Sequence, residues 1–502
     1  MTTKVYLVGA GPGDPELITL KAKRLLEQAD CVLYDHLAPA ELLAIAPPAA
    51  ERIYVGKKKS NHALSQEEIC ALLVDRGHKA LNVVRLKGGD PFIFGRGGEE
   101  AEALAAAGIP FEVVPGVTSP LGIAAYTGVP LTHRDHTSVV TFVTGHEVDK
   151  IDWNKTGLSE TLVVFMGLSH FDQIAERILA AGRSPDTPAI AVRWGTRPDQ
   201  EVLTGTLATL PALIHERGLK PPATVIVGEV VSLRPKLSWF ERLPLFGRRI
   251  VVTRAREQAG TLSQSLRALG AEVIELPTIE IRPAPDYAAL DNAIAALASY
   301  DWLLFTSTNG VRFFLDRLDA GTVDLRAIRG RICAIGPATR EALERFHLKV
   351  DVMAEQYVAE GLLTALSGHN LSAARVLIAR AAVARDTLPA ELTRRGAHVD
   401  VVEAYRTLPP EDLAERAAAL LARQPDWITF TSSSTARNLV NATGAAALQN
   451  VRTASIGPIT SATLRELGVP VTIEAAEFTV PGLIDAILAA ESNGAPDHNR
   501  LP

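Results

Sequence analysis

The chain has 502 residues, 47% of them hydrophobic and 22% charged, which is typical of a soluble globular protein. This length predicts several domains, because single hydrophobic cores stop growing well below it. The net charge of −6 argues against a general nucleic-acid binder, and the three cysteines are too widely spaced for a zinc site or a disulfide framework.

The N-terminus leads directly into an expected strand at Lys4–Val8, with no signal peptide before it. No apolar run reaches the length that crosses a membrane. With so few cysteines, the pattern predicts a cytoplasmic protein in a reducing compartment. We expect no membrane partner, no nucleic-acid partner and no metal centre.

The first expected strand, Val5–Val8, runs into the glycine-rich turn Gly9–Pro15 and then a helix expected over 16–28. Strand, glycine turn and helix are typical of a nucleotide site. The dinucleotide fingerprint needs glycine where this chain has Asp14, and Pro12 has no N–H to offer a phosphate. The turn could still approach an adenosine without phosphate, or it could be a tight connection only.

Four more expected strands follow, and each ends in a distinctive segment. The strands are expected at 31–34, 52–55, 80–85 and 111–114, with helices at 66–76 and 99–107. They end, respectively, in Asp35, Gly56–Lys59, the glycine loop Arg85–Glu99 and Pro115–Ser119. Open α/β sheets bind ligands at the carboxyl ends of their strands, so the five strand ends predict one shared site. Taken singly, Asp35 could be only a helix N-cap and the lysine run only a solvated face.

A second α/β domain is expected from strands at 139–143, 161–165, 189–192 and 224–227, with a helix at 171–181. Residues 233–246, with two prolines and the Trp239-Phe240 pair, predict a linker.

The remainder of the chain contains an internal repeat. Arg249–Ala255 matches Arg375–Ala381, Phe305–Ser307 matches Phe430–Ser432, and Ile335–Pro337 matches Ile456–Pro458, the last pair 121 residues apart (456 minus 335). Two copies predict two similar α/β lobes with a cleft between them. The repeated turns carry hydroxyls and glycines that suit a polyanion, although each could be a simple N-cap. The candidate substrate contacts are Thr306, Ser307, Asn309, Gly336, Thr431, Ser432, Ser433 and Gly457.

The first half resembles the tetrapyrrole methylase family, in particular its uroporphyrinogen-III C-methyltransferases. The resemblance rests on Val8–Asp14, Tyr34-Asp35, Val55–Lys57, Arg85–Glu99, Pro115–Thr118, Pro130–Arg134, Val143–His146, Phe165–Leu168 and Gly195-Thr196. It implies that S-adenosylmethionine binds between two α/β domains, with Asp35 as proton acceptor and Lys57 as proton donor. The implied cofactor contacts are Pro12, Gly88, Gly89, Asp90, Ile93, Thr118, Ser119, Met166 and Gly195. Plausible receivers for the substrate's carboxylates are Lys58, Arg85, Arg96 and Arg134.

The second half resembles the uroporphyrinogen-III synthase family, from Gly247 to about Ala490. The resemblance implies cyclisation of hydroxymethylbilane with inversion of the last ring. It also implies that the chain leaves one lobe near Arg282 and returns near Tyr405. Tyr405 matches the tyrosine proposed to help expel the hydroxyl, and it could equally be a packing residue at the crossover.

The two resemblances predict a bifunctional enzyme of sirohaem or cobalamin precursor synthesis. The synthase half would make uroporphyrinogen III, and the methylase half would convert it through precorrin-1 to precorrin-2. The alternative is a methylase of a later corrin intermediate with a non-catalytic, two-lobed C-terminal half. We expect a homodimer formed through the first half. The expected limits are 1–245 (parts 1–134 and 135–240), 247–490 (lobe one 247–282 with 405–490, lobe two 283–404) and a disordered tail, 491–502.

Overall fold

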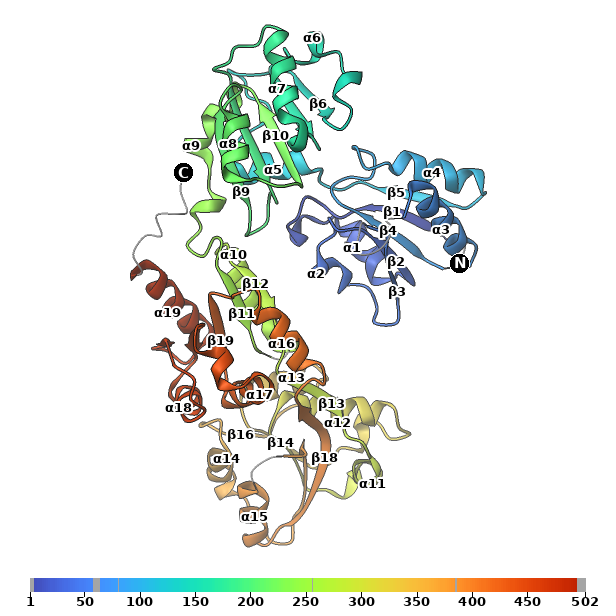
Figure 1. The fold of residues 1–502 in the computed structure, drawn as a ribbon. Coiled ribbons are helices and arrows are strands. Elements are labelled where there is room, and N and C mark those ends of the chain that lie inside the picture. The colour runs from blue at the N-terminus through green and yellow to red at the C-terminus, as the bar shows by residue number, and fades with distance from the viewer. Residues whose placement is uncertain (1–3, 57–63, 80, 255, 384–385, 494–502) are drawn as a thin grey trace. The chain divides into compact units, whose positions relative to one another are not determined.

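The computed structural model describes residues 4–56, 64–79, 81–254, 256–383 and 386–493 (Figure 1). Contacts divide the chain into a first unit, Met1–Arg249 with Ser265–Glu272, and a second unit, Ile250–Gln264 with Val273–Pro502. Each unit contains two sheets flanked by helices, which confirms the expected α/β class. Among the described residues, no helix is both long and apolar enough to cross a membrane.

The first sheet of the first unit is parallel throughout, in the order β3-β2-β4-β1-β5. All five strand ends therefore meet at one edge, as predicted. The strands are β1 (Val5–Gly9), β2 (Cys31–Tyr34), β3 (Glu51–Tyr54), β4 (Val83–Lys87) and β5 (Phe111–Val114). The helices are α1 (Leu20–Glu27), α2 (Ala40–Leu43), α3 (Gln66–His78), α4 (Gly97–Ala106) and α5 (Ser119–Thr127).

Two elements of this sheet differ from the sequence prediction. The helix expected from residue 16 begins only at Leu20, because Thr19 caps it by accepting a hydrogen bond from the Ala22 amide. Strand β4 continues to Lys87 instead of ending at Arg85. Since side chains alternate along a strand, Arg85 and Lys87 share one face of this fully buried strand.

The second sheet of the first unit is mixed, in the order β6-β7-β10-β8-β9. Its strands are β6 (Val140–Thr144), β7 (Thr161–Phe165), β8 (Pro188–Arg193), β9 (Glu201–Thr206) and β10 (Ala223–Val227). Its helices are α6 (Trp153–Thr156), α7 (Phe171–Ala180) and α8 (Leu210–Arg217). The prediction missed β9, an edge strand with no fully buried residue and therefore no strong apolar signal.

The linker expected at 233–246 is instead folded against the first unit. It contains α9 (Arg234–Leu237) and the 3₁₀ turn η5 (Phe240–Arg242). The Arg234 guanidinium and the Trp239 indole donate to backbone carbonyls of α5, at 2.8 and 2.9 Å. The segment is part of the first unit, although some of its side chains, such as Leu237 and Trp239, are exposed.

The second unit has a five-stranded sheet, β12-β11-β19-β20-β21, and a six-stranded sheet, β13-β18-β17-β14-β15-β16. The first contains β11 (Arg249–Val252), β12 (Glu272–Glu275), β19 (Trp427–Phe430), β20 (Arg452–Ser455) and β21 (Ile473–Glu474). The second contains β13 (Glu280–Pro283), β14 (Trp302–Phe305), β15 (Arg331–Ala334), β16 (Val352–Met353), β17 (Arg375–Ala381) and β18 (His398–Leu408).

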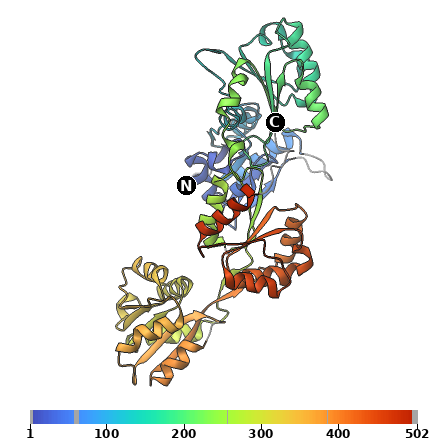
Figure 2. The ribbon, with the colours of Figure 1, turned by 90° about the vertical axis from the view of Figure 1, so that its left-hand side faces the viewer.

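Helices lie on both sides of the six-stranded sheet (Figure 2), and a hydrophobic cluster fills each side. The helices of this unit are α10 (Arg256–Ala268), α11 (Ala288–Ala295), α12 (Thr308–Asp319), α13 (Pro337–Glu344), α14 (Ala359–Ala365), α15 (Thr387–Arg394), α16 (Leu413–Leu421), α17 (Ser433–Thr443), α18 (Pro458–Glu466) and α19 (Val480–Asn493). Helix α19 includes 491–493 of the tail expected to be disordered, and 494–502 lie outside the described residues.

Candidate functional site

Three strand-end loops of the first unit pack backbone to backbone through glycines. The Gly89 amide donates to the Gly11 carbonyl at 2.7 Å, and the Gly11 amide donates back at 3.2 Å. A Cβ on Gly116 would lie 2.3 Å from the Gly89 carbonyl oxygen and 2.8 Å from Gly9 Cα. The loops after β1, β4 and β5 therefore form one assembly in which a side chain would not fit.

The predicted cofactor residue Asp90 holds this assembly together. One carboxylate oxygen accepts from the Phe92 amide at 2.8 Å, and the other accepts from the Gly116 amide at 3.0 Å. Its neighbour Gly88 lies against Leu37, because a Cβ there would come within 2.5 Å of the Leu37 Cβ. Thr118 and Ser119, also predicted to contact the cofactor, begin α5 beside Gly89.

The remaining predicted cofactor residues lie around the same loops. Pro12 packs against Gly122 of α5, and Gly195 follows β8 against Ile123. The Asp14 amide donates to Thr196 Oγ1 at 2.9 Å, which ties the loop after β1 to the segment after β8. The structure thus brings predicted residues from both sheets of the first unit to one region.

The backbone is strained where the second sheet meets this region. Met166, Trp194 and Thr196 all have positive φ angles, of 51°, 50° and 72°. Such conformations cost free energy in residues other than glycine and cluster at ligand sites. Met166, a predicted cofactor contact, directly follows β7 and is 52% exposed.

Exposed apolar side chains accompany these glycine loops, and they suit an adenosine with an aliphatic chain. Ile93, predicted to contact the cofactor, is 38% exposed, and Phe94 packs on Phe165 with ring centroids 4.9 Å apart. Further exposed members are Leu37, Phe92 and Leu121. Close backbone approach with apolar surface and no phosphate cradle fits S-adenosylmethionine.

In the glycine turn after β1, the Asp14 side chain is engaged by groups of the protein itself. The Asp14 side chain caps the following 3₁₀ turn at the Glu16 amide and accepts from the Tyr126 hydroxyl at 2.5 Å. Burial, followed by this contact with Asp14, raises the pKa of Tyr126. Both carboxylate oxygens of Asp14 therefore have partners within the first unit.

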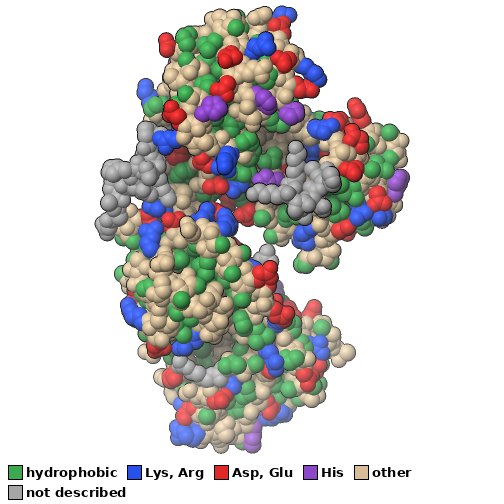
Figure 3. Space-filling view, in the orientation of Figure 1, with side chains coloured by type: hydrophobic (Ala, Val, Ile, Leu, Met, Phe, Trp, Pro, Cys, Tyr) green, Lys and Arg blue, Asp and Glu red, His purple; other side chains and the backbone are tan. Residues whose placement is uncertain are grey.

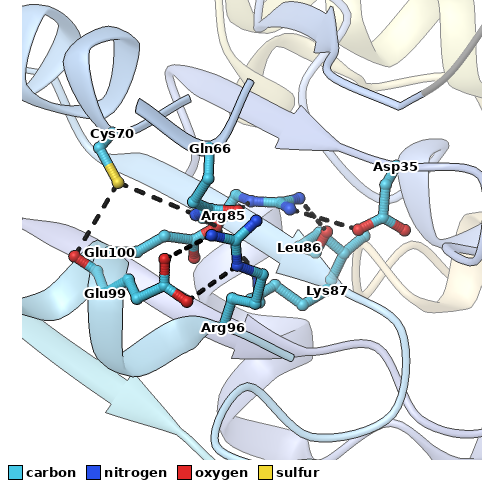
Figure 4. A network of polar contacts seen from close by, with 9 residues as sticks. All are labelled: Asp35, Gln66, Cys70, Arg85, Leu86, Lys87, Arg96, Glu99 and Glu100. Carbon is cyan, nitrogen blue, oxygen red and sulfur yellow. Dashed lines mark hydrogen bonds and ion pairs between the residues drawn. The ribbon is translucent and has the colours of Figure 1, made fainter. Parts of the chain in front are cut away.

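Strand β4 presents a buried network of charges beside the predicted base (Figure 4). Glu100 Oε1 accepts from Lys87 Nζ at 2.9 Å and from Arg85 Nε at 3.2 Å. Arg85 Nη2 also lies 3.3 Å from Asp35 Oδ2. The other Asp35 oxygen accepts from the Leu37 amide at 3.0 Å. Asp35 thus stands at the end of β2 with its carboxylate oriented from two sides.

The cationic residues predicted to receive substrate carboxylates differ in their surroundings. Arg85 is only 4% exposed and bonds to protein groups, which favours a role inside the protein over a substrate contact. Arg96 is exposed and pairs with Glu99, and Arg134 is exposed. The predicted proton donor Lys57 and the predicted substrate contact Lys58 lie outside the described residues.

In the second unit, the repeated turns have the same geometry. Ser307 and Ser432 cap α12 and α17 with φ and ψ of −164°, 156° and −164°, 157°. Ser307 Oγ accepts from the Gly310 amide at 3.0 Å, and Ser432 Oγ accepts from the Thr435 amide at 3.3 Å. The N-cap interpretation is therefore correct for both serines. Thr306, Asn309, Thr431 and Ser433 in the same turns are partly exposed.

Tyr405 lies at the end region of β18 and is 7% exposed. Its hydroxyl is 3.0 Å from Ser307 Oγ, and its ring stacks on Phe313 at a centroid distance of 5.7 Å. The structure thus joins two predicted site residues, although it buries the tyrosine ring in a hydrophobic cluster.

Two aromatic residues near the second pair of repeated turns were missed by the sequence analysis. Gly336 and Gly457 precede α13 and α18, and each lies against an exposed ring, Tyr357 and Phe478, 60% and 64% exposed. These rings are also 121 residues apart (478 minus 357). The spacing of the repeat therefore carried the signal that could have found them.

Charged side chains of both signs are interspersed over the face of each unit seen in Figure 3. Within the described part of the chain, no group of histidine, cysteine, aspartate and glutamate side chains is arranged to hold a metal ion.

Comparison with known proteins divides the chain in the same order as the two units. Residues 4–211 match the family model for tetrapyrrole (corrin/porphyrin) methylases, and residues 260–485 match that for uroporphyrinogen-III synthase HemD. A porphyrin biosynthesis protein HemD from Ruminiclostridium josui is 38% identical over 491 residues, 96% of this chain and 97% of that protein.

Two further matches cover the first half of the chain. The siroheme synthase of Ectopseudomonas mendocina is 54% identical over 242 residues, 47% of this chain, and the chain spans about half of that protein (52%). The crystal structure of uroporphyrin-III C-methyl transferase from Thermus thermophilus complexed with S-adenyl homocysteine has 44% identity and a TM-score of 0.40, covering 46% of this chain and 99% of that one.

With a TM-score below 0.5, that structural match is only a likeness, and the assignment rests on the sequence comparisons. The relative from R. josui matches along almost the whole chain, across both family segments. The chain therefore belongs to the family of porphyrin biosynthesis proteins that join a tetrapyrrole methylase to a uroporphyrinogen-III synthase.

Proposed function

We propose that the chain is a bifunctional enzyme that makes uroporphyrinogen III and then methylates it. The observation that supports this is the pairing of the two family segments in one chain, because the product of the second is a substrate for the first. The synthase half closes hydroxymethylbilane to uroporphyrinogen III with inversion of the last ring. The methylase half converts that product to precorrin-1 and then to precorrin-2.

The methyl donor of the first half is S-adenosylmethionine, which supplies a methyl group on a sulfonium for attack by an electron-rich pyrrole carbon. The glycine loops after β1, β4 and β5 bind the methyl donor and orient it toward the substrate, because a reaction between two bound partners gains mainly from alignment. Asp35 accepts the proton that the ring loses, and Lys57 returns one. Exposed Arg96 and Arg134, with Lys58, receive substrate carboxylates.

In the second half, the two repeated sets of turns bind the carboxylates of the linear substrate. The amides that begin α12, α13, α17 and α18, with their flanking hydroxyls, can donate to such groups. Tyr405 assists loss of the hydroxyl, and Ser307 orients its phenol through the 3.0 Å contact. The active protein is a cytoplasmic homodimer formed through the first half, which sedimentation of the purified protein would test.

One reaction mixture tests both activities. The purified protein receives hydroxymethylbilane and S-adenosylmethionine labelled in the methyl group, and the products are separated by liquid chromatography and mass spectrometry. We expect a tetrapyrrole with two labelled methyl groups. Uroporphyrinogen III supplied alone isolates the methylation step, and hydroxymethylbilane without the methyl donor isolates cyclisation.

Two outcomes would contradict the proposal. Uncatalysed closure, which gives only the non-inverted isomer, would show that the second half is not a synthase and would favour a ligand-binding role for it. Failure to label uroporphyrinogen III, with labelling of a later corrin intermediate, would make the first half a methylase of that later step.

A further inference from the structure

A buried ion network lies behind the predicted base: Glu100 Oε1 accepts from two cations, whereas the buried Glu100 Oε2 has no hydrogen-bond partner among the described residues. Glu100 is 0% exposed, and Arg85 and Lys87 are each 4% exposed. Replacing a buried ion network by apolar groups of similar volume is often neutral or stabilising. Stability alone therefore does not explain why three charges are held inside this sheet.

The contacts of the network connect α4, through β4, to the end of β2. Glu100, in the first turn of α4, accepts from both cations through the single oxygen Oε1. Gln66 of α3 also points its amide at this atom, at 3.4 Å. Arg85 continues the chain of contacts to Asp35 and is fixed further by donating to the Leu86 carbonyl at 3.0 Å. The guanidinium thus bridges the buried carboxylate and the partly exposed one.

The charged neighbours of Lys87 shift its pKa in opposite directions. Burial lowers the pKa of Lys87, and the neighbouring positive charge of Arg85 lowers it further. Glu100 and Asp35 act in the opposite direction and raise the pKa of Lys87. Glu100 is therefore the group that keeps two adjacent buried cations compatible with each other.

We propose that Glu100 is a positioning residue for methyl transfer, which holds Arg85 against Asp35 and offsets one of the two positive charges that act on this base. The inference rests on the proposed function, in which Asp35 accepts the proton. The three buried side chains have a net charge of +1, from two cations and one carboxylate. Removal of Glu100 or of Lys87 changes this net charge, in opposite directions.

Other charged groups near the network are Arg96 and Glu99, which pair with each other; Arg96, and more weakly Lys87, lowers the pKa of Glu99. Cys70 of α3 lies close enough to Glu100 for the carboxylate to contribute to raising the pKa of its thiol. Along the chain, His36 directly follows Asp35. Arg85 is the cation that pairs directly with Asp35, at 3.3 Å.

Three variants change the net charge of the network in a planned order. Glu100→Gln removes one negative charge, Lys87→Met removes one positive charge, and the double variant removes both. A nearby positive charge favours the ionised carboxylate, so the base stays active to lower pH in Glu100→Gln and only to higher pH in Lys87→Met. We expect the acid limb of the pH–rate profile to move by about one pH unit, to lower pH in Glu100→Gln and to higher pH in Lys87→Met. This size corresponds to the Coulomb energy of one charge acting on a nearby carboxylate.

The measurement is the single-turnover rate of methyl transfer from labelled S-adenosylmethionine to uroporphyrinogen III, followed from pH 5 to pH 9. All variants receive the same substrate, so its own titration is common to every profile. Glu102→Gln is the matched control, because Glu102 is a carboxylate on the same helix that is not buried. Binding of S-adenosylhomocysteine, measured by calorimetry, reports whether each variant retains its fold.

The directions in which the acid limb shifts decide between an electrostatic role of Glu100 and a general disruption of the site. Opposite shifts in the two single variants, with a wild-type limb in the double variant and in Glu102→Gln, support the inference. The inference is overturned if both single variants shift the acid limb in the same direction. It is also overturned if the limb does not move in variants that bind S-adenosylhomocysteine normally. If Glu100→Gln fails to bind, Lys87→Met and the double variant still supply the comparison. Absence of methylation in the wild-type protein would instead refute the proposed function itself.

Discussion

Substitution of Gly116 by alanine should destabilise the first unit strongly. The added Cβ would lie 2.3 Å from the Gly89 carbonyl oxygen and 2.8 Å from Gly9 Cα, where ordinary contacts are 3.4–4 Å. Both neighbours are backbone, so no side-chain rotation relieves the overlap. Overpacking of this kind costs about 3 kcal/mol, the upper part of its usual range. For a unit of this size the unfolding temperature should fall by roughly 6–12 °C.

Differential scanning calorimetry of the full chain measures this effect. Two units prevent a two-state analysis of the whole chain, so the relevant transition is the one that S-adenosylhomocysteine raises. Gly98→Ala is the matched control: Gly98 lies in the first turn of α4, and a Cβ there would have no atom within 4 Å. Alanine there should stabilise by about 0.4–1 kcal/mol.

The comparison refutes the packing argument if the Gly116→Ala transition stays within about 1 °C of the wild-type value, since a cost of 1 kcal/mol or more moves it further. Equal losses in both variants would point to a general intolerance of alanine in these loops and not to the close approach.

Other predictions address single groups. Asp35→Asn should bind S-adenosylhomocysteine normally but methylate about 10²–10⁴-fold more slowly, as expected for loss of a general base; undiminished single-turnover rates would exclude Asp35 from that role. Tyr405→Phe should slow cyclisation and leave methylation of added uroporphyrinogen III intact, because the tyrosine belongs to the second unit; equal loss of both activities would contradict this. Iodoacetamide at pH 8 should modify Cys70 first, because burial raises the pKa of Cys31 and of Cys333 to about 12 and both thiols are inaccessible; mass spectrometry showing early modification of either buried thiol would refute it.

Much of the first sheet was predictable because parallel strands bury both faces and read as short apolar runs. Strands β2 and β5 begin and end at the residues predicted from sequence. The convergence of the strand-end loops followed from the parallel order alone. The edge strand β9 was missed because half-exposed residues leave no such run.

The interior of the site was not predictable in the same way. Arg85 and Lys87 were expected in a ligand loop, because charged residues rarely occupy a central strand. Their burial depends on Glu100, which comes from a separate helix, and no local pattern connects the three positions. Asp90 is predicted to contact the cofactor, and the sequence did not show that its two oxygens accept amides of two loops, its own and the one after β5.

The order of the strands in the second unit constrains how the chain can fold during synthesis. Every strand of the six-stranded sheet has been synthesised once Leu408 is added, whereas the pairing of β11 with β19 requires residues up to Trp427 and beyond, since Ile250 pairs with Trp427. Residues 280–408 form the six-stranded sheet and lie between β12 and β19 in the chain. Because Glu280 pairs with Leu408, formation of this sheet brings the two ends of the segment 280–408 side by side. The loop that β11 and β19 must then close is far shorter than the 177 residues between them (427 minus 250), which lowers the entropy cost of closure. Folding of the six-stranded sheet thereby lowers the entropy cost of forming the five-stranded sheet.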